Sequence, residues 1–173
     1  KPVIGLRTVL RVDGLDVAVL AYAVEASHIE QLYRYVGGGA ITEATELAIV
    51  VLPDNWKTSD PMHRRRLFHQ LLNHVKEDRL WLGLPAPQTT EHVLVLKQLR
   101  AMREELGVRL IPAPETRYMR QDDFEAYRAL VAIGEGDVIS EEDIHHRGRH
   151  VRLPSEMNDW FDADELAELE RFE

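Results

Sequence analysis

The alternation of apolar and polar residues near the N-terminus predicts a β-hairpin. Thr8 to Val12 and Asp16 to Val24 are two runs rich in apolar and β-branched residues, and Asp13-Gly14-Leu15 separates them. Two such runs joined by an Asp-Gly turn are typical of paired antiparallel strands. We therefore expect residues 8–24 to form the first two strands of a sheet.

A helix is predicted directly after this hairpin. Ser27 is a suitable N-terminal cap, because its hydroxyl can accept a hydrogen bond from a backbone N–H of the first turn. The apolar positions that follow at helical spacing are Ile29, Leu32, Tyr33 and Val36. Gly37-Gly38-Gly39 is expected to end this helix, and it lacks the strand-then-helix context of a phosphate-binding loop.

The next segments read as alternating strands and helices. Leu47 to Leu52 is a continuous apolar run closed by Pro53-Asp54, which predicts a buried central strand. A helix should follow from Pro61 to about Lys76, with Ser59 or Asp60 as its cap.

The same alternation continues beyond this helix. Leu80 to Leu84 predicts a second buried strand, and a long helix capped by Thr89 or Thr90 should run to Leu106, where Gly107 ends it. Val108 to Ile111 is a third such strand. This order implies right-handed parallel crossovers. The predicted fold class is α/β, with a mixed central sheet, an N-terminal antiparallel hairpin followed by parallel strand–helix units, and helices on both faces.

The pattern becomes less regular after Pro114. Gln121 to Ile133 predicts a helix, and Met157 to Glu173 predicts an acidic amphipathic helix. We expect residues 1–114 to form the α/β core and residues 115–173 a helical, acidic extension that packs on the core or on a partner. The aromatic side chains predicted to bind such a partner are those of Trp160, Phe161 and Phe172.

Composition narrows the classes of function. The chain contains no cysteine, which excludes disulfides and thiolate metal sites and is expected of a cytoplasmic protein. The longest uncharged apolar run, Val17 to Val24, is far shorter than the ~20 residues of a membrane span. Residues 1–80 carry ten basic and ten acidic side chains, so the net charge of −9 lies wholly in residues 81–173. DNA or RNA should therefore bind the N-terminal half, and a protein partner or a second copy the acidic C-terminal half.

The hairpin and its helix carry the residues best suited to chemistry. Asp13 or Asp16 is expected at the turn, Glu25 at the end of the second strand, and Gln31 and Tyr35 one turn apart on the helix. Carboxylates on adjacent strands supply the hard oxygen ligands that Mg²⁺ or Mn²⁺ requires.

This layout of an acid, a hairpin strand with Glu25-Ala26-Ser27, and a helix with Gln31 and Tyr35 resembles the PD-(D/E)xK nuclease superfamily over about residues 6–85. The resemblance implies metal-dependent hydrolysis of phosphodiester bonds, and a restriction or defence system would suit it. In that interpretation Asp13, Asp16 and Glu25 bind the metal, and Gln31 and Tyr35 orient substrate or water.

The sequence departs from the superfamily at one position. Ser27 stands where the superfamily has a lysine, and a hydroxyl cannot supply the positive charge that stabilises the developing anion. Arg34 is the nearest substitute. The alternative is a catalytically inactive nuclease fold that serves as a nucleic-acid-binding or assembly subunit of a larger complex, in which the acidic turn and the helix residues are ordinary structural positions.

Three further features have weaker functional interpretations. Arg64, Arg65 and Arg66 could contact phosphates, although such a cluster is also typical of a solvated helix face. His145, His146 and His150 lack the spacing of a metal site, and solvated histidines are expected. A doubly wound domain with a small-ligand site near Pro53-Asp54 and Pro85-Ala86 ranks last, because no glycine-rich loop accompanies it.

Overall fold

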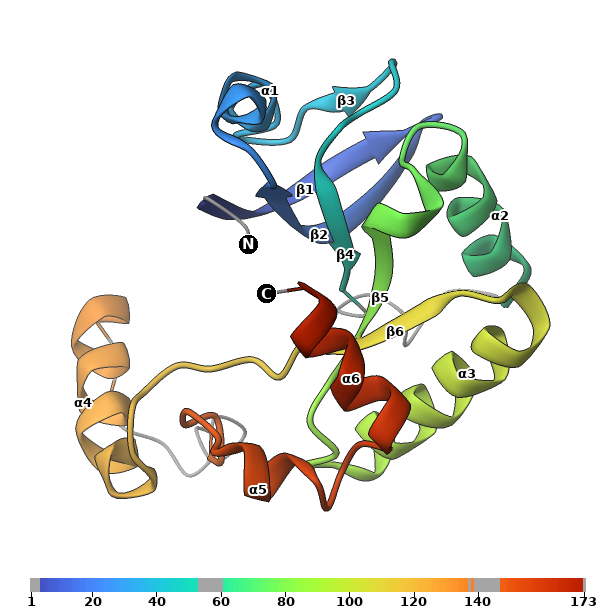
Figure 1. Cartoon of the computed structure of the whole chain (residues 1–173). Helices are drawn as coiled ribbons and strands as arrows, with labels where there is room; N and C mark the ends of the chain where they lie inside the picture. Colours follow the sequence, from blue (N-terminus) through green and yellow to red (C-terminus); the bar gives the residue numbers. More distant parts are fainter. Residues whose placement is uncertain (1–3, 53–60, 137, 139–146, 173) are drawn as a thin grey trace. The chain divides into compact units, whose positions relative to one another are not determined.

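The computed structural model describes residues 4–52, 61–136, 138 and 147–172 (Figure 1). The chain forms two compact units, one of residues 1–113 with 162–173 and one of residues 114–161. In the described part of the first unit, six strands form one sheet in the order β3-β1-β2-β4-β5-β6. The predicted α/β class with a mixed sheet is confirmed.

The N-terminal hairpin is present as predicted. Strands β1 (Ile4–Val12) and β2 (Leu15–Ala23) pair antiparallel, with Arg11 opposite Asp16 next to the turn. Asp13 and Gly14 have positive φ angles of 49° and 82°, the backbone that a two-residue hairpin turn requires and that Asp-Gly readily adopts. The short strand β3 (Ala40–Ile41) pairs parallel with the end of β1.

The chain leaves β2 through a short 3₁₀ turn, η1 (Ala26–His28), before α1 (Ile29–Arg34). The prediction that Ser27 caps the helix is wrong. Ser27 lies inside the 3₁₀ turn, where its backbone is already helical, and its hydroxyl donates to Oε2 of Glu25 at 3.4 Å instead. The helix ends at Arg34, somewhat before the glycine triplet that was expected to stop it.

The parallel half of the sheet follows the predicted order. The elements are β4 (Ala48–Val51), α2 (Pro61–Leu72), η2 (Glu77–Arg79), β5 (Leu80–Leu84), α3 (Thr90–Leu106) and β6 (Arg109–Pro112). Strand β4 pairs antiparallel with β2 and parallel with β5, and β5 pairs parallel with β6. The Thr89 hydroxyl accepts from the backbone N–H of His92, and Gly107 closes α3 with φ of 65°, both as predicted. The expected caps Ser59 and Asp60 lie outside the described residues.

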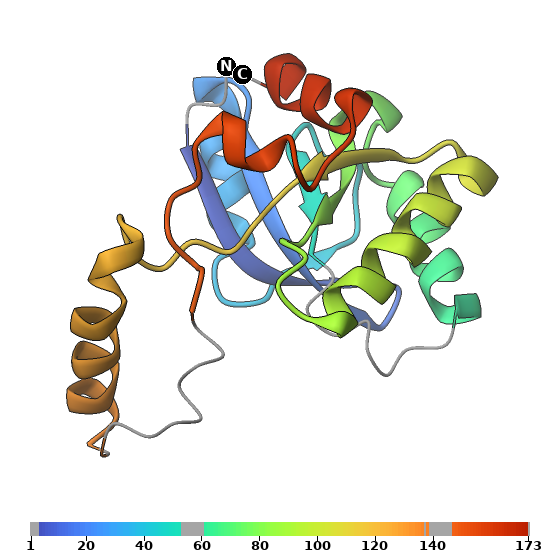
Figure 2. The same ribbon diagram turned by 90° about the horizontal axis from the view of Figure 1, so that it is seen from below.

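Helices cover both faces of the sheet, because the buried strands present apolar side chains in both directions. On one face Val50 and Trp81 pack against Leu169 and Phe172 of the C-terminal helix α6 (Ala163–Phe172). Helices α2 and α3 contact the sheet from the other side (Figures 1 and 2). The predicted arrangement of helices is confirmed.

The prediction of a single helix over residues 157–173 is wrong. Residues 154–157 form the short helix α5 (Pro154–Met157), and α6 starts anew at Ala163. A reciprocal pair of hydrogen bonds starts α6: the backbone N–H of Glu165 donates to Oδ1 of Asp162 at 2.9 Å, and that of Asp162 donates to Oε2 of Glu165 at 3.0 Å. Helix α6 belongs to the first unit, whereas the predicted division at residue 114 placed it in the extension.

The second unit contains η3 (Gln121–Asp123) and α4 (Phe124–Glu135), which together match the helix predicted from residue 121. Its buried side chains include those of Tyr118, Phe124 and His150. No helix in the described ranges has the length and apolar character that crossing a bilayer requires.

Candidate functional site

The carboxylates predicted to share a metal ion lie at opposite ends of the hairpin. Asp13 and Asp16 stand at the turn, whereas Glu25 follows the far end of β2. Glu25 lies nine positions after Asp16, and the seven steps of β2 from Asp16 to Ala23 alone span about 23 Å at ~3.3 Å per residue. One ion cannot reach both ends, so the structure does not bring together the three residues expected to bind it.

The acidic residues of the turn have other roles. Asp16 accepts two hydrogen bonds from Arg11, at 2.8 Å and 3.1 Å, across the hairpin. This contact lowers the pKa of the Asp16 carboxyl below its ordinary value. Over residues 4–52, 61–136, 138 and 147–172, no three His, Asp or Glu side chains are grouped closely enough to hold a metal ion.

Gln31 and Tyr35 tie α1 to the sheet. The Gln31 carbonyl oxygen accepts from the backbone N–H of Glu46 at 3.1 Å. Tyr35 is buried, which raises the pKa of its phenol, and its backbone oxygen accepts from the Thr8 hydroxyl at 2.9 Å. Both residues therefore make structural contacts, through the side chain of Gln31 and the backbone of Tyr35.

The three arginines of the predicted cluster differ in exposure. Arg64 is buried, with 6% of its surface exposed, and it donates to Gln98 of α3. Arg65 pairs with Glu105 of the same helix, and Arg66 is exposed. Arg34, the suggested substitute for the missing lysine, makes an exposed ion pair with Glu30 at 3.3 Å. Arg64 is therefore buried against α3, and of the three arginines Arg65 and Arg66 are exposed.

The aromatic residues predicted to bind a partner belong to different units. Trp160 and Phe161 lie in the second unit, where Phe161 is buried and Arg152 lies 4.6 Å from the centre of the Trp160 ring. Phe172 lies in the first unit and packs within it, against the sheet face that carries Trp81. Phe161 and Phe172 are thus each packed within their own unit.

The histidine prediction is corrected at one position. His150 is buried at 6% exposure rather than solvated, and its Nε2 lies 3.6 Å from a carboxylate oxygen of Glu156. His145 and His146 lie outside the described residues, as does Pro53-Asp54 of the small-ligand alternative.

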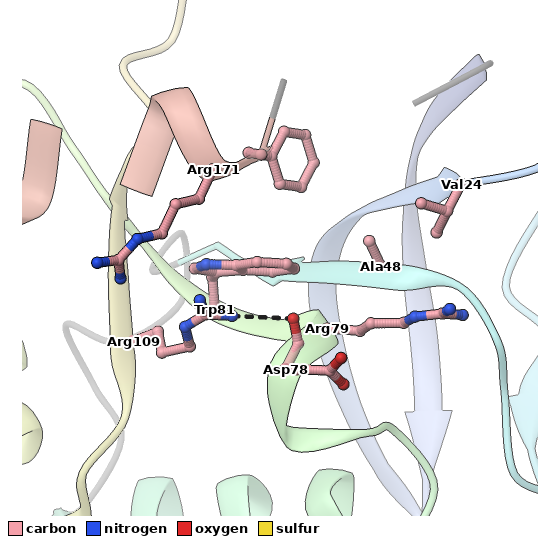
Figure 3. A pocket seen from close by; sticks show the side chains of 8 residues that line it. Val24, Ala48, Asp78, Arg79, Trp81, Arg109 and Arg171 are labelled. Carbon is pink, nitrogen blue, oxygen red and sulfur yellow. Dashed lines mark hydrogen bonds between the residues drawn. The ribbon is translucent and has the colours of Figure 1, made fainter. Parts of the chain in front are cut away.

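A pocket of about 390 Å³ opens at the end of the sheet where Glu25 lies, and Figure 3 shows it from close by. Parallel strands begin at the same edge of a sheet, so the first residues of β4, β5 and β6 are neighbours there. The last turn of α6 supplies a further wall. The lining residues are Val24, Ala48, Asp78, Arg79, Trp81, Arg109, Arg171 and Phe172.

The pocket has an apolar floor with cationic groups at its two sides. Ala48 and Trp81 are almost fully buried, and the Phe172 ring meets the Trp81 ring edge-on with centroids 5.2 Å apart. Figure 3 shows the side chains of Arg79 and Arg171 extending to opposite sides of the Trp81 ring. The guanidinium of Arg109 lies 5.1 Å from the centre of that ring, a distance typical of a cation–π contact.

One buried carboxylate organises the Arg109 side of the pocket. Glu168 of α6 accepts from the Trp81 indole N–H at 2.9 Å, pairs with Arg109 at 3.2 Å and also pairs with Arg171. Arg109 additionally donates to the backbone oxygen of Asp78 at 2.9 Å. These bonds fix the orientation of Arg109 and neutralise part of its charge.

The opposite side is organised by Glu46, which precedes β4. It pairs with Lys76 at 2.7 Å and with Arg79 at 2.8 Å. The hydrogen bond from Lys76, followed by the attraction of both cations, lowers the pKa of the Glu46 carboxyl. Each side of the pocket thus combines cationic side chains with a single carboxylate that pairs with them.

Sequence reasoning missed this site because its arginines are far apart in the chain. Arg79, Arg109 and Arg171 belong to three separate elements, and no local cluster marks them. A usable signal was present: Arg79 immediately precedes a buried strand, and Arg109 begins the next one. In a parallel arrangement, two such positions lie at the same edge of the sheet.

Comparisons with known proteins add no relative: no family model matches the chain, and no curated protein matches it significantly in sequence. The geometry of the pocket and the separation of the hairpin carboxylates are therefore the observations on which a function can be proposed.

Proposed function

We propose that this chain is a nucleic-acid-binding domain that holds a short single-stranded segment in the pocket and does not hydrolyse it at the hairpin. The observation that carries the proposal is an apolar floor flanked on two sides by guanidinium groups, those of Arg79 and of Arg109 with Arg171. The proposal follows the non-catalytic alternative for a nuclease-like fold.

The chemistry of a single strand suits such a pocket. Its phosphates are anions spaced along the chain, and each intervening base is a flat ring that can lie on apolar or aromatic side chains. Guanidinium groups bind phosphate oxygens with paired, charge-assisted hydrogen bonds. A pocket of about 390 Å³ also falls within the ~300–1,000 Å³ typical of ligand sites.

Charge sets the expected strength of binding. The chain carries a net charge of −9, which opposes long-range attraction of a polyanion, so affinity must come from local contacts. If one phosphate binds at each side of the pocket, the logarithm of the affinity should fall with the logarithm of salt concentration with a slope of about −1.4, taking ~0.7 per phosphate for single strands.

Fluorescence anisotropy with a labelled thymidine hexanucleotide tests the proposal. Arg79→Ala and Arg171→Ala should each weaken binding about fivefold to tenfold, since each loses one charge-assisted contact. Lys97→Ala, which removes the same charge from an exposed position on α3, is the matched control and should bind as the unmodified chain does. Equal affinities for all three variants would contradict the proposal, as would tight binding of an acidic peptide in place of the oligonucleotide.

A second assay separates binding from hydrolysis. Because Asp16 and Glu25 cannot share an ion, we expect no oligonucleotide cleavage that depends on Mg²⁺ or Mn²⁺ and on Glu25. Metal-dependent cleavage that Glu25→Ala abolishes would restore the nuclease hypothesis with a different ligand set.

A further inference from the structure

We infer that Glu168 of α6 acts as an internal anion that occupies the Arg109 and Arg171 side of the pocket and competes with the ligand phosphate. This inference rests on the proposed function and specifies how the same site is regulated. The Glu168 carboxylate already forms ion pairs with Arg109 and Arg171, the guanidinium groups that a phosphate would bind.

The contacts of Glu168 show how fully it uses these groups. Its side chain is 9% exposed, and one carboxylate oxygen accepts from both the Trp81 indole and Arg109, while the other faces Arg171. Arg171 itself is 65% exposed. A phosphate entering the pocket can therefore reach Arg171 first and must then share or displace Glu168 to reach Arg109.

Displacement of Glu168 need not detach α6. The first turn of the helix is held separately by Glu165, which accepts two hydrogen bonds from Arg100 at 2.7 Å and 2.8 Å. Phe172 also holds the last turn between Tyr22 and Trp81, with ring centroids 4.9 Å and 5.2 Å away. The helix therefore has one attachment for which the ligand competes, at Glu168, and another outside the pocket lining, at Glu165.

A purely structural role for Glu168 predicts the opposite effect on affinity. If the carboxylate only positioned Arg109 and Arg171, removing its charge would let these side chains move and would weaken binding. If it competes, removing its charge frees two guanidinium groups and strengthens binding. The sign of the change in affinity therefore distinguishes the two roles.

The test is Glu168→Gln, which removes the charge and retains an oxygen that can accept from the Trp81 indole. Affinity for the thymidine hexanucleotide should rise about fivefold, as expected when a competing ion pair worth ~1 kcal/mol is removed. The matched control is Glu170→Gln, which makes the same charge change at an exposed position of the same helix. Affinity of Glu168→Gln equal to or below that of Glu170→Gln would overturn the inference.

A second readout follows α6 directly. In the unmodified chain, oligonucleotide binding should accelerate amide hydrogen exchange over residues 166–172, because Glu168 loses its partners when the phosphate binds. Slower exchange there would show that the ligand clamps the helix and would contradict competition. If neither the unmodified chain nor Glu168→Gln binds the hexanucleotide, the proposed function itself fails. If both bind with equal affinity, only the inference fails.

Discussion

The attachment of α6 through Glu165 is open to a quantitative test. The Glu165 side chain has no exposed surface, and both of its oxygens accept from Arg100. One of them also accepts from the backbone N–H of Asp162 at 3.0 Å and so helps to start the helix. Glu165→Ala removes the ion pair and part of the cap in a single change.

The expected loss of stability follows from these contacts. Removing one partner of a buried ion pair costs about 3–5 kcal/mol. The Arg100 side chain is 36% exposed, so its guanidinium can recover part of its hydration, and the cost of losing the ion pair should fall below that range. Loss of the cap adds about 0.5–1 kcal/mol. Together these terms predict that Glu165→Ala lowers the free energy of unfolding by about 3 kcal/mol.

Urea denaturation of the first unit measures this quantity. Replacing Trp56 and Trp160 with Phe in every variant leaves Trp81, a residue of the α6 face, as the only tryptophan reporter. The control is Glu170→Ala, an exposed position of the same helix, which should change stability by less than ~0.5 kcal/mol. In thermal melts, Glu165→Ala should lower Tm by about 6–12 °C for a chain of this size.

A loss below ~1 kcal/mol for Glu165→Ala, or one equal to that of Glu170→Ala, would refute this reasoning. It would mean that α6 is held by its apolar residues alone and that the ion pair with Arg100 contributes no net stability.

Three further changes have defined outcomes. Burial raises the pKa of Asp162, but the hydrogen bond from the Glu165 backbone and a guanidinium of α3 outweigh it and lower that pKa below the ordinary value. Asp162→Asn should therefore lower the free energy of unfolding, measured by urea titration, by its full amount at neutral pH. This difference from the unmodified chain should disappear as pH falls below about 4, where the Asp162 carboxylate becomes protonated. Arg64→Ala should destabilise the chain by about 1–3 kcal/mol because its hydrogen-bonded guanidinium is buried, whereas Arg66→Ala should change the melting temperature little. Gly83→Ala should cost about 1–3 kcal/mol in thermal unfolding, since a Cβ there would lie 3.0 Å from a side-chain carbon and 3.2 Å from a backbone oxygen.

Much of the fold could be predicted from the sequence because local patterns report local structure. The Asp13-Gly14 turn, the apolar strands and the ends of α3 at Thr89 and Gly107 were all read correctly. Each depends on backbone preferences or hydrogen bonds within a few residues. The break before α6 was missed although it has the same local origin, because Asp162 and Glu165 form a capping pair that interrupts an otherwise continuous amphipathic pattern.

The candidate site could not be predicted in this way, because it depends on contacts between elements that are far apart in the sequence. The hairpin was predicted, yet its length places Asp16 and Glu25 at opposite ends, so the correct secondary structure did not produce the expected metal site. The arginines of the pocket come from η2, β6 and α6, which only the parallel register of the sheet and the return of α6 place together. The sequence by itself determined which elements form, since their signals lie within a few residues of one another. Tertiary structure alone decided which charged side chains meet, because that depends on strand order and direction across the whole sheet.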